Sequence, residues 1–183
     1  MELIKQNTQT QIIKSIIIVL LGTVILTISA KIKIPFYPVP MTMQTFVVLL
    51  LGMSFGYKIG IATVTLYLLE GIVGLPVFSN SPERGLGLAY FTGPTMGYLI
   101  GFLLACFFAS FVKKEDGYFF IFIKLTLSVS IIYIFGVLWL GMLLGWSKPI
   151  IQLGVMPFLL AEIFKITLLT FLAKKLFKFR RFI

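Results

Sequence analysis

The sequence predicts an all-α membrane protein, a bundle of six transmembrane helices that forms a single domain over residues 1–183. Hydrophobic residues make up 59% of the chain and charged residues only 12%, against about 25% charged residues in soluble domains. The mean hydropathy is +1.06. A soluble fold of this length cannot bury so much apolar surface in one core. The apolar residues also form runs that approach the roughly 20 residues needed to cross a bilayer as a helix.

The first predicted helix covers residues 12–30 and leads into a proline-rich loop, residues 31–42. Lys5 and Lys14 precede the apolar run, so a cleaved signal peptide is an alternative interpretation. The run is long enough to span a bilayer, and the rest of the chain is equally apolar. A retained transmembrane helix is therefore favoured.

The apolar stretch that follows the proline-rich loop predicts either one long helix or two short ones. One helix would place Lys58 near the middle of the membrane, at a cost of about 2.5–3.5 kcal/mol on insertion scales. A turn at Gly56-Tyr57-Lys58 leaves this lysine in water. We therefore expect two helices, at residues 41–55 and 59–74.

The last three helices are predicted at residues 93–112, 118–144 and 154–176. A loop rich in glycine and proline, residues 75–92, precedes them. Glycines recur at four-residue spacing, as at Gly93, Gly97 and Gly101. Small residues at this interval let helix backbones approach closely in lipid, so these glycines indicate helix packing.

The basic residues predict that both termini are cytoplasmic. With six helices, the termini share one side of the membrane with the turns at Lys58 and Lys113-Lys114, and the opposite side receives the loops at 31–42 and 75–92. Ten basic residues fall on the side of the termini: Lys5, Lys14, Lys58, Lys113, Lys114, Lys174, Lys175, Lys178, Arg180 and Arg181. Four fall on the other side: Lys31, Lys33, Arg84 and Lys148. The richer side is cytoplasmic by the positive-inside rule.

Several function classes are disfavoured by what the sequence lacks. It has no histidine and one cysteine, Cys106, so we expect no metal centre, no cofactor and no histidine-dependent catalysis. No G-x-x-x-x-G-K-[ST] run occurs, so ATP hydrolysis would have to come from another subunit. The net charge of +10 is spread singly or in pairs between apolar runs. That distribution suits membrane topology and lipid headgroups, and predicts no nucleic-acid partner.

Two charged residues lie inside the sixth predicted helix, where ionisable groups are costly and usually functional. Glu162 and Lys165 are three residues apart and therefore share one helical face. Counted from the outer end of the helix, they lie about 12–17 Å deep at about 1.5 Å per residue. One interpretation is an ion pair that only locks the bundle. The other is an outward-facing pocket in which Lys165 meets an anionic group and Glu162 accepts hydrogen bonds from ligand N–H groups.

Other polar and aromatic residues fall at the same outer level and are candidates for this pocket. They are Gln44, after the first outer loop, Asn80 and Tyr90, in and beside the second, and Trp139, in the outer half of the fifth helix. Small-molecule pockets combine apolar walls with a few placed polar groups. For the aromatic residues, an interfacial belt is the alternative.

Four ordered motifs resemble the BioY family, the biotin-binding S components of energy-coupling factor transporters. They are IPFYPVPMTMQT at residues 34–45, YLLEG at 67–71, GLPVF at 74–78 and GPTMGYLIGF at 93–102. The resemblance extends from about Leu21 to Lys174. It implies a six-helix bundle in the plasma membrane that holds biotin near its outer face. It also implies three partner subunits: a transmembrane coupling protein and two cytoplasmic ATPases.

The resemblance also assigns individual residues. The acid and lysine on the last helix of the family correspond to Glu162 and Lys165, and the loop asparagine to Asn80. This sequence departs from the family at two places. Glu162 stands where the family usually has aspartate. Thr23 and Thr27 stand where S components tend to carry Ala-x-x-x-Ala for docking to the coupling protein.

Two other functions remain open at this point. The chain resembles an uptake subunit, and the ligand could be another vitamin, such as thiamine or riboflavin. It could also be a membrane assembly subunit that transports nothing. An enzyme is the least favoured class, because no pair of nucleophile and base is visible in the sequence.

Overall fold

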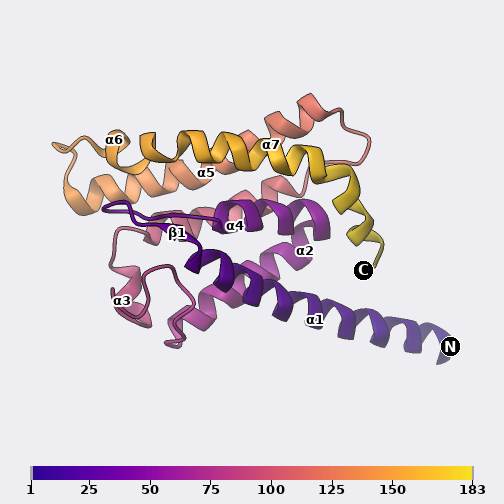
Figure 1. Cartoon of the computed structure of the whole chain (residues 1–183). Helices are drawn as coiled ribbons and strands as arrows, with labels where there is room; N and C mark the ends of the chain where they lie inside the picture. The colour runs from indigo at the N-terminus through magenta and orange to yellow at the C-terminus, as the bar shows by residue number, and fades with distance from the viewer. Residues whose placement is uncertain (1, 183) are drawn as a thin grey trace.

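The computed structural model describes the backbone of residues 2–182 and the side chains of residues 9–180. Five main helices run side by side along the long axis of the molecule (Figure 1). They are α1 (Glu2–Lys31), α2 (Gln44–Ile72), α4 (Met96–Ala109), α5 (Tyr118–Leu144) and α7 (Leu159–Leu176). The shorter elements are β1 (Lys33–Ile34), β2 (Met41–Thr42), α3 (Leu88–Phe91), α6 (Ile150–Gly154) and two 3-10 turns, Met156–Phe158 and Phe177–Phe182.

The helix α2 is broken at Gly56, as the sequence predicted. Gly56 has φ 78° and ψ 173°, which is not a helical conformation and which residues with a Cβ rarely adopt. Lys58, just after the break, is exposed. Within the described residues, α1, the two segments of α2, α4, α5 and α7 therefore provide six apolar helical segments in the predicted order.

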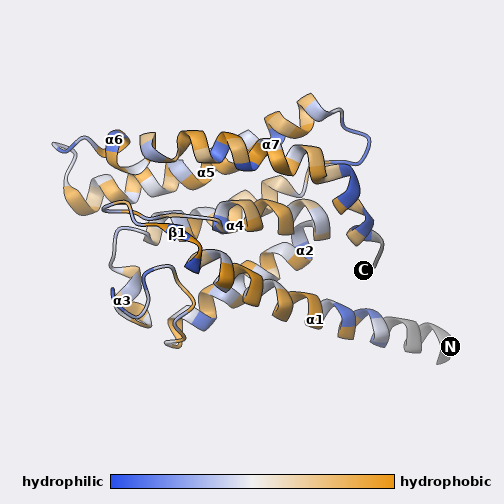
Figure 2. Cartoon of the chain, viewed as in Figure 1, coloured by the Kyte–Doolittle hydropathy of each residue, from blue (hydrophilic) through white to orange (hydrophobic). Residues whose placement is uncertain are grey.

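Four regions of the described chain are long and apolar enough to cross a membrane: Gln9–Lys31, Gln44–Ile72, Tyr118–Leu144 and Ile150–Arg180. The helix α4 is apolar but shorter, with 14 residues. The predicted all-α membrane fold is confirmed. Large apolar side chains face outward on α1, where Leu20, Val24 and Ile28 are between 51% and 56% exposed. Figure 2 shows that apolar residues predominate along the middle of the main helices. Lipid is the environment that suits such a surface.

The structure differs from the sequence prediction at several helix ends and in the first outer loop. The helix α1 begins before residue 12, and α2 begins at Gln44 instead of residue 41, which belongs to β2. The chain before α4 forms a turn at residues 93–95, so α4 begins at Met96 instead of residue 93. The last helix is interrupted around Pro157, which has no backbone N–H to continue the hydrogen-bond ladder. The proline-rich loop contains an unpredicted antiparallel ribbon, in which Lys33 pairs with Thr42. Ribbons of two residues per strand are too short to leave a sequence pattern.

The helix α4 packs most extensively against α5 and α2. Glycines make this close approach possible, because a Cβ at Gly97 would collide with the backbone carbonyl of Phe135 on α5. A Cβ at Gly101 would lie 2.7 Å from the Cα of Ile132 on the same helix. The predicted role in helix packing is confirmed for Gly97 and Gly101, whereas Gly93 lies in the turn before α4.

The two ends of the bundle differ. The N-terminal end of α1 and the C-terminal turn lie at the same end, as an even number of spans requires (Figure 1). The opposite end carries the ribbon, α3 and α6. There the outer loops fold over the helices, and Lys31 at the end of α1 donates to the carbonyl oxygens of Phe78 (2.8 Å) and Ser81 (3.0 Å).

Candidate functional site

A cavity lies below the ribbon at the loop-covered end of the bundle. It contains about 540 Å³ of space free of protein atoms, a volume that includes the open space at its mouth. Its lining comes from both outer loops and from α2, α3, α4, α5 and α7. The lining residues are Val39, Pro40, Met41, Thr42, Gln44, Thr45, Phe78, Ser79, Tyr90, Thr95, Tyr98, Leu99, Phe102, Ile132, Tyr133, Phe158 and Glu162.

The charged part of the site is a buried ion pair on α7. Lys165 Nζ lies 2.8 Å from Glu162 Oε1, and the two side chains are 5% and 6% exposed. The ammonium also donates to the carbonyl oxygen of Thr42 (2.7 Å) and to Thr45 Oγ1 (3.0 Å). An ammonium has three N–H donors, so all three of Lys165 have acceptors in the protein.

Only one of the two carboxylate oxygens of Glu162 accepts hydrogen bonds from the described residues. Its Oε1 accepts from Lys165 and from the hydroxyl of Thr45, which lies 2.9 Å away. Its Oε2 is buried and has no hydrogen-bond partner among the described residues. Glu162 lines the cavity, whereas Lys165 does not. The Tyr133 hydroxyl lies beside this carboxylate, and Glu162 also lines a groove between α5 and α7. Since buried acceptors are normally satisfied, Oε2 is the oxygen available to a ligand donor.

Polar bonds also hold the first loop against the core. Gln44 is 4% exposed and its amide donates to the hydroxyl of Tyr67 at 2.8 Å. That hydroxyl donates in turn to the carbonyl of Val77 (3.0 Å) in the second loop. The hydroxyl of Thr42 donates to Gln44 Oε1 at 3.2 Å. Gln44 therefore lines the cavity with its amide already engaged on both sides.

Aromatic side chains form much of the remaining wall. The rings of Phe78 and Tyr90 lie 4.6 Å apart between centroids, and the Tyr90 hydroxyl lies 3.3 Å from Ser79 Oγ. On the other side, Tyr133 packs against Tyr98 and Phe158, with centroid distances of 6.0 and 6.1 Å. Tyr133 also lies next to Glu162. The cavity thus combines flat apolar walls with one negatively charged acceptor.

Comparison with known proteins decides the family. The model of the BioY family matches residues 4–182 of this chain. The chain belongs to the BioY family. The resemblance carried by the four sequence motifs is confirmed, and with it the prediction that the chain is not an enzyme, because BioY is a family of transporter subunits.

Similar members of the BioY family come from distant organisms. A probable biotin transporter BioY from Pyrococcus horikoshii is 32% identical over 163 residues, which is 89% of this chain and 96% of that protein. The biotin transporter BioY from Thermotoga maritima is 34% identical over 157 residues, 85% of this chain and 91% of that protein. A family of transporters with several apolar helices is a family of multi-pass membrane proteins.

The fold of this BioY chain also matches a solved structure. The crystal structure of the S-component for biotin from an ECF-type ABC transporter superposes with a TM-score of 0.78 at 25% sequence identity. The match covers 92% of this chain and 93% of the crystallised one. The six-segment bundle is therefore the architecture of an S component.

Of the six residues predicted to bind the ligand of this BioY protein, three line the cavity: Gln44, Tyr90 and Glu162. Lys165 lies behind Glu162, so the geometry favours a role in holding that carboxylate, and its contact with a ligand anion stays a prediction. Asn80 is half-buried next to the cavity wall and accepts from Lys33 Nζ at 2.9 Å. Trp139 donates from its indole N–H to the carbonyl of Gly93 at 2.8 Å and anchors the turn before α4.

The predicted docking residues lie on α1. Thr23 is 3% exposed and its hydroxyl donates to the carbonyl of Leu20. Thr27 is half-buried and donates to the carbonyl of Thr23. Thr23 therefore faces the bundle, and the open face of α1 is formed by larger apolar side chains. A docking role for the two threonines stays a prediction.

Sequence reasoning did not select six of the polar lining residues: Thr42, Thr45, Ser79, Thr95, Tyr98 and Tyr133. Thr45 follows Gln44 directly, and its place in the first turn of α2 next to a predicted site residue is a usable signal. Tyr133 lies on α5, the helix that also carries the predicted Trp139. Ser79 and Tyr98 carried no signal, because their position depends on how the second loop and α4 pack.

Proposed function

We propose that this chain is the biotin-binding S component of an energy-coupling factor transporter and takes part in biotin uptake. The names of its relatives and the matched crystal structure support biotin as the ligand. The observation that carries the proposal is the free Oε2 of Glu162 in a cavity with aromatic walls. Biotin offers ureido N–H donors on a compact bicycle with apolar faces, which this combination suits.

The roles of the individual residues follow from their geometry. Glu162 accepts a hydrogen bond from a ureido N–H through Oε2, a charge-assisted bond worth about 1.5–3 kcal/mol. Lys165 holds the Glu162 carboxylate in place through their 2.8 Å ion pair. Tyr90 forms an apolar wall for the ring. Gln44 fixes the first loop above it.

The remaining predicted residues act at a distance from the ring. Asn80 meets the ligand at the mouth, through the loop that also contributes Ser79 to the lining. Trp139 supports the site by holding the turn before α4 in place. We propose no cofactor and no metal for the chain.

The proposed setting is a plasma membrane with both termini in the cytoplasm, where residues 1–183 form one membrane domain. The ten-to-four distribution of basic residues supports this orientation. It places the cavity on the outer side, where the vitamin is captured. The partners are a transmembrane coupling protein, for which Thr23 and Thr27 mark the proposed docking helix, and two cytoplasmic ATPases that supply the energy.

Uptake and co-purification test the proposal together. Cells that lack their own biotin transporter should accumulate labelled biotin when this chain is expressed with its coupling protein and ATPases. A tag on the C-terminus should retrieve the same three subunits. Failure to accumulate biotin, with accumulation of labelled thiamine or riboflavin instead, would reassign the vitamin. Failure to bind or move any of them would favour an assembly subunit.

A further inference from the structure

The carboxylate of the proposed ligand has no obvious partner on α7. All three N–H groups of Lys165 already donate to the protein, and this side chain does not line the cavity. Glu162 presents an acceptor, which repels a second carboxylate. If the ligand's N–H groups bind Glu162, its anionic end meets a different part of the wall.

Three cations stand at the loop-covered mouth: Lys31, Lys33 and Arg84. Lys31 is fully engaged, because its ammonium donates to the carbonyls of Phe78 and Ser81 and, at 3.5 Å, to the hydroxyl of Ser81. It therefore fastens the second loop to the end of α1. It has no donor left for a ligand.

Arg84 connects the two outer loops on their solvent-facing side. Its Nη1 donates to the carbonyl of Pro38 at 2.7 Å, and its guanidinium lies 5.8 Å from the ring centroid of Tyr37. The Tyr37 side chain is 79% exposed. Arg84 thus joins the two loops from the solvent side, and neither Arg84 nor Tyr37 lines the cavity.

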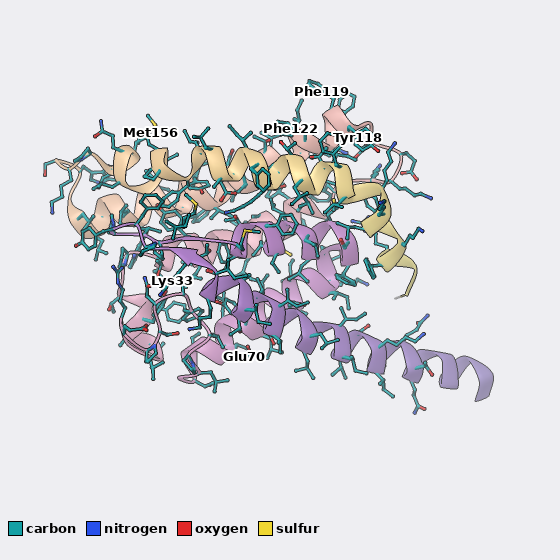
Figure 3. All side chains as sticks on the ribbon, viewed as in Figure 1. Lys33, Glu70, Tyr118, Phe119, Phe122 and Met156 are labelled. Carbon is teal, nitrogen blue, oxygen red and sulfur yellow. The ribbon has the colours of Figure 1, made fainter. Side chains whose placement is uncertain are left out.

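Lys33 is placed differently. It extends from β1 at the loop-covered end of the bundle, where Figure 3 labels it. Its ammonium donates to the carbonyl of Ser79 (2.7 Å) and to Asn80 Oδ1 (2.9 Å). These bonds use two of its three N–H groups, and no described residue accepts the third. Neither Lys33 nor Asn80 lines the cavity, but Ser79 does, so these bonds hold the exposed ammonium just outside the cavity wall.

The same contact orients Asn80. Its amide oxygen is occupied by Lys33, so the two N–H donors of Nδ2 remain, and no described residue accepts from them. An ammonium N–H and an amide NH2 thus lie side by side, both available as donors. Two adjacent donors with a positive charge match the two oxygens of a carboxylate.

We propose that Lys33, together with the Asn80 amide that it orients, binds the carboxylate of the ligand at the mouth of the cavity. The inference rests on the proposed function, because it concerns the opposite end of the same ligand. It makes Lys33 a specificity residue for acids over neutral analogues. The charge that selects the acid then comes from the first loop and not from α7.

Binding of biotin and of biotinamide, in which a neutral amide replaces the carboxylate, tests the inference on the purified full chain. Wild-type protein should prefer biotin by roughly two- to fivefold, the value of an ion pair near water. Lys33→Met should remove this preference by weakening biotin alone. The preference in wild-type protein should also shrink in concentrated salt, which screens a pair at the mouth.

Lys31→Met is the matched control, because Lys31 holds the same loop but has no free donor. It should keep the preference for biotin even if both affinities fall. An equal fall for both compounds in Lys33→Met would overturn the inference, and so would loss of the preference in Arg84→Gln instead. Wild-type binding of both compounds without preference would overturn the inference alone. Wild-type binding of neither would overturn the proposed function with it.

Discussion

The buried pair Glu162–Lys165 allows structural and ligand-binding roles to be separated with three variants. Both side chains are nearly inaccessible to solvent. Removing one partner of such a pair leaves a buried charge uncompensated, which costs about 3–5 kcal/mol. For a chain of this size that corresponds to a fall in melting temperature of about 10 °C. Glu162→Gln and Lys165→Met should each show it in detergent-solubilised protein.

The double variant Glu162→Gln/Lys165→Met should behave differently. It replaces the ion pair by neutral side chains of similar volume, a change that is often neutral or stabilising in buried sites. Its melting temperature should therefore exceed that of either single variant. A double variant that is less stable than both single variants would show that the two charges are not coupled.

Ligand affinity should follow the acceptor and not the melting temperature. In Glu162→Gln, Lys165 and Thr45 still require an acceptor at the Oε1 position, so the amide NH2 replaces Oε2 towards the cavity. Loss of a charge-assisted bond worth about 1.5–3 kcal/mol lowers affinity about 10- to 150-fold. The stable double variant should also lose at least about tenfold. Unchanged affinity in that protein, measured by calorimetry, would remove Glu162 from the site and leave the pair a structural role.

Two further predictions concern packing and topology. Gly97→Ala should lower the melting temperature, because the added Cβ meets the backbone of α5 and overpacking costs about 1–3 kcal/mol. Gly117→Ala is the control and should leave the melting temperature unchanged, because the space around Gly117 is open. Equal effects of the two substitutions would contradict the close approach of α4 and α5. In a Cys106→Ser background, a cysteine that replaces Glu83 should react with an impermeant maleimide on intact cells. A cysteine that replaces Lys114 should react only after the cells are permeabilised. The reverse pattern would show that the protein has the opposite orientation in the membrane.

Local patterns were sufficient to predict the order of the apolar helical segments, although not all of their ends. Hydropathy and length gave α5 its bounds, and the cost of placing Lys58 in lipid predicted the break at Gly56. The three-residue spacing of Glu162 and Lys165 predicted their contact, since spacing on one helix determines which side chains meet. These features depend only on residues close together in the chain.

The rest of the site depends on contacts between distant residues. Thr45 bonds to Glu162 across 117 positions, and Lys33 reaches Asn80 across 47. No periodicity encodes such pairs, because they are set by how α2 meets α7 and how the two loops fold over each other. For the same reason the sequence did not show that Lys165 would lie behind Glu162, or that Trp139 would support α4.

Direct binding of vitamins to the purified chain tests the central claim most directly. Titration calorimetry in detergent should give saturable binding of biotin with one ligand per chain. Thiamine and riboflavin should bind much more weakly, since neither presents the N–H edge of a ureido ring to Glu162 together with a carboxylate. Tighter binding of either vitamin, or no heat with biotin in folded protein, would contradict the account.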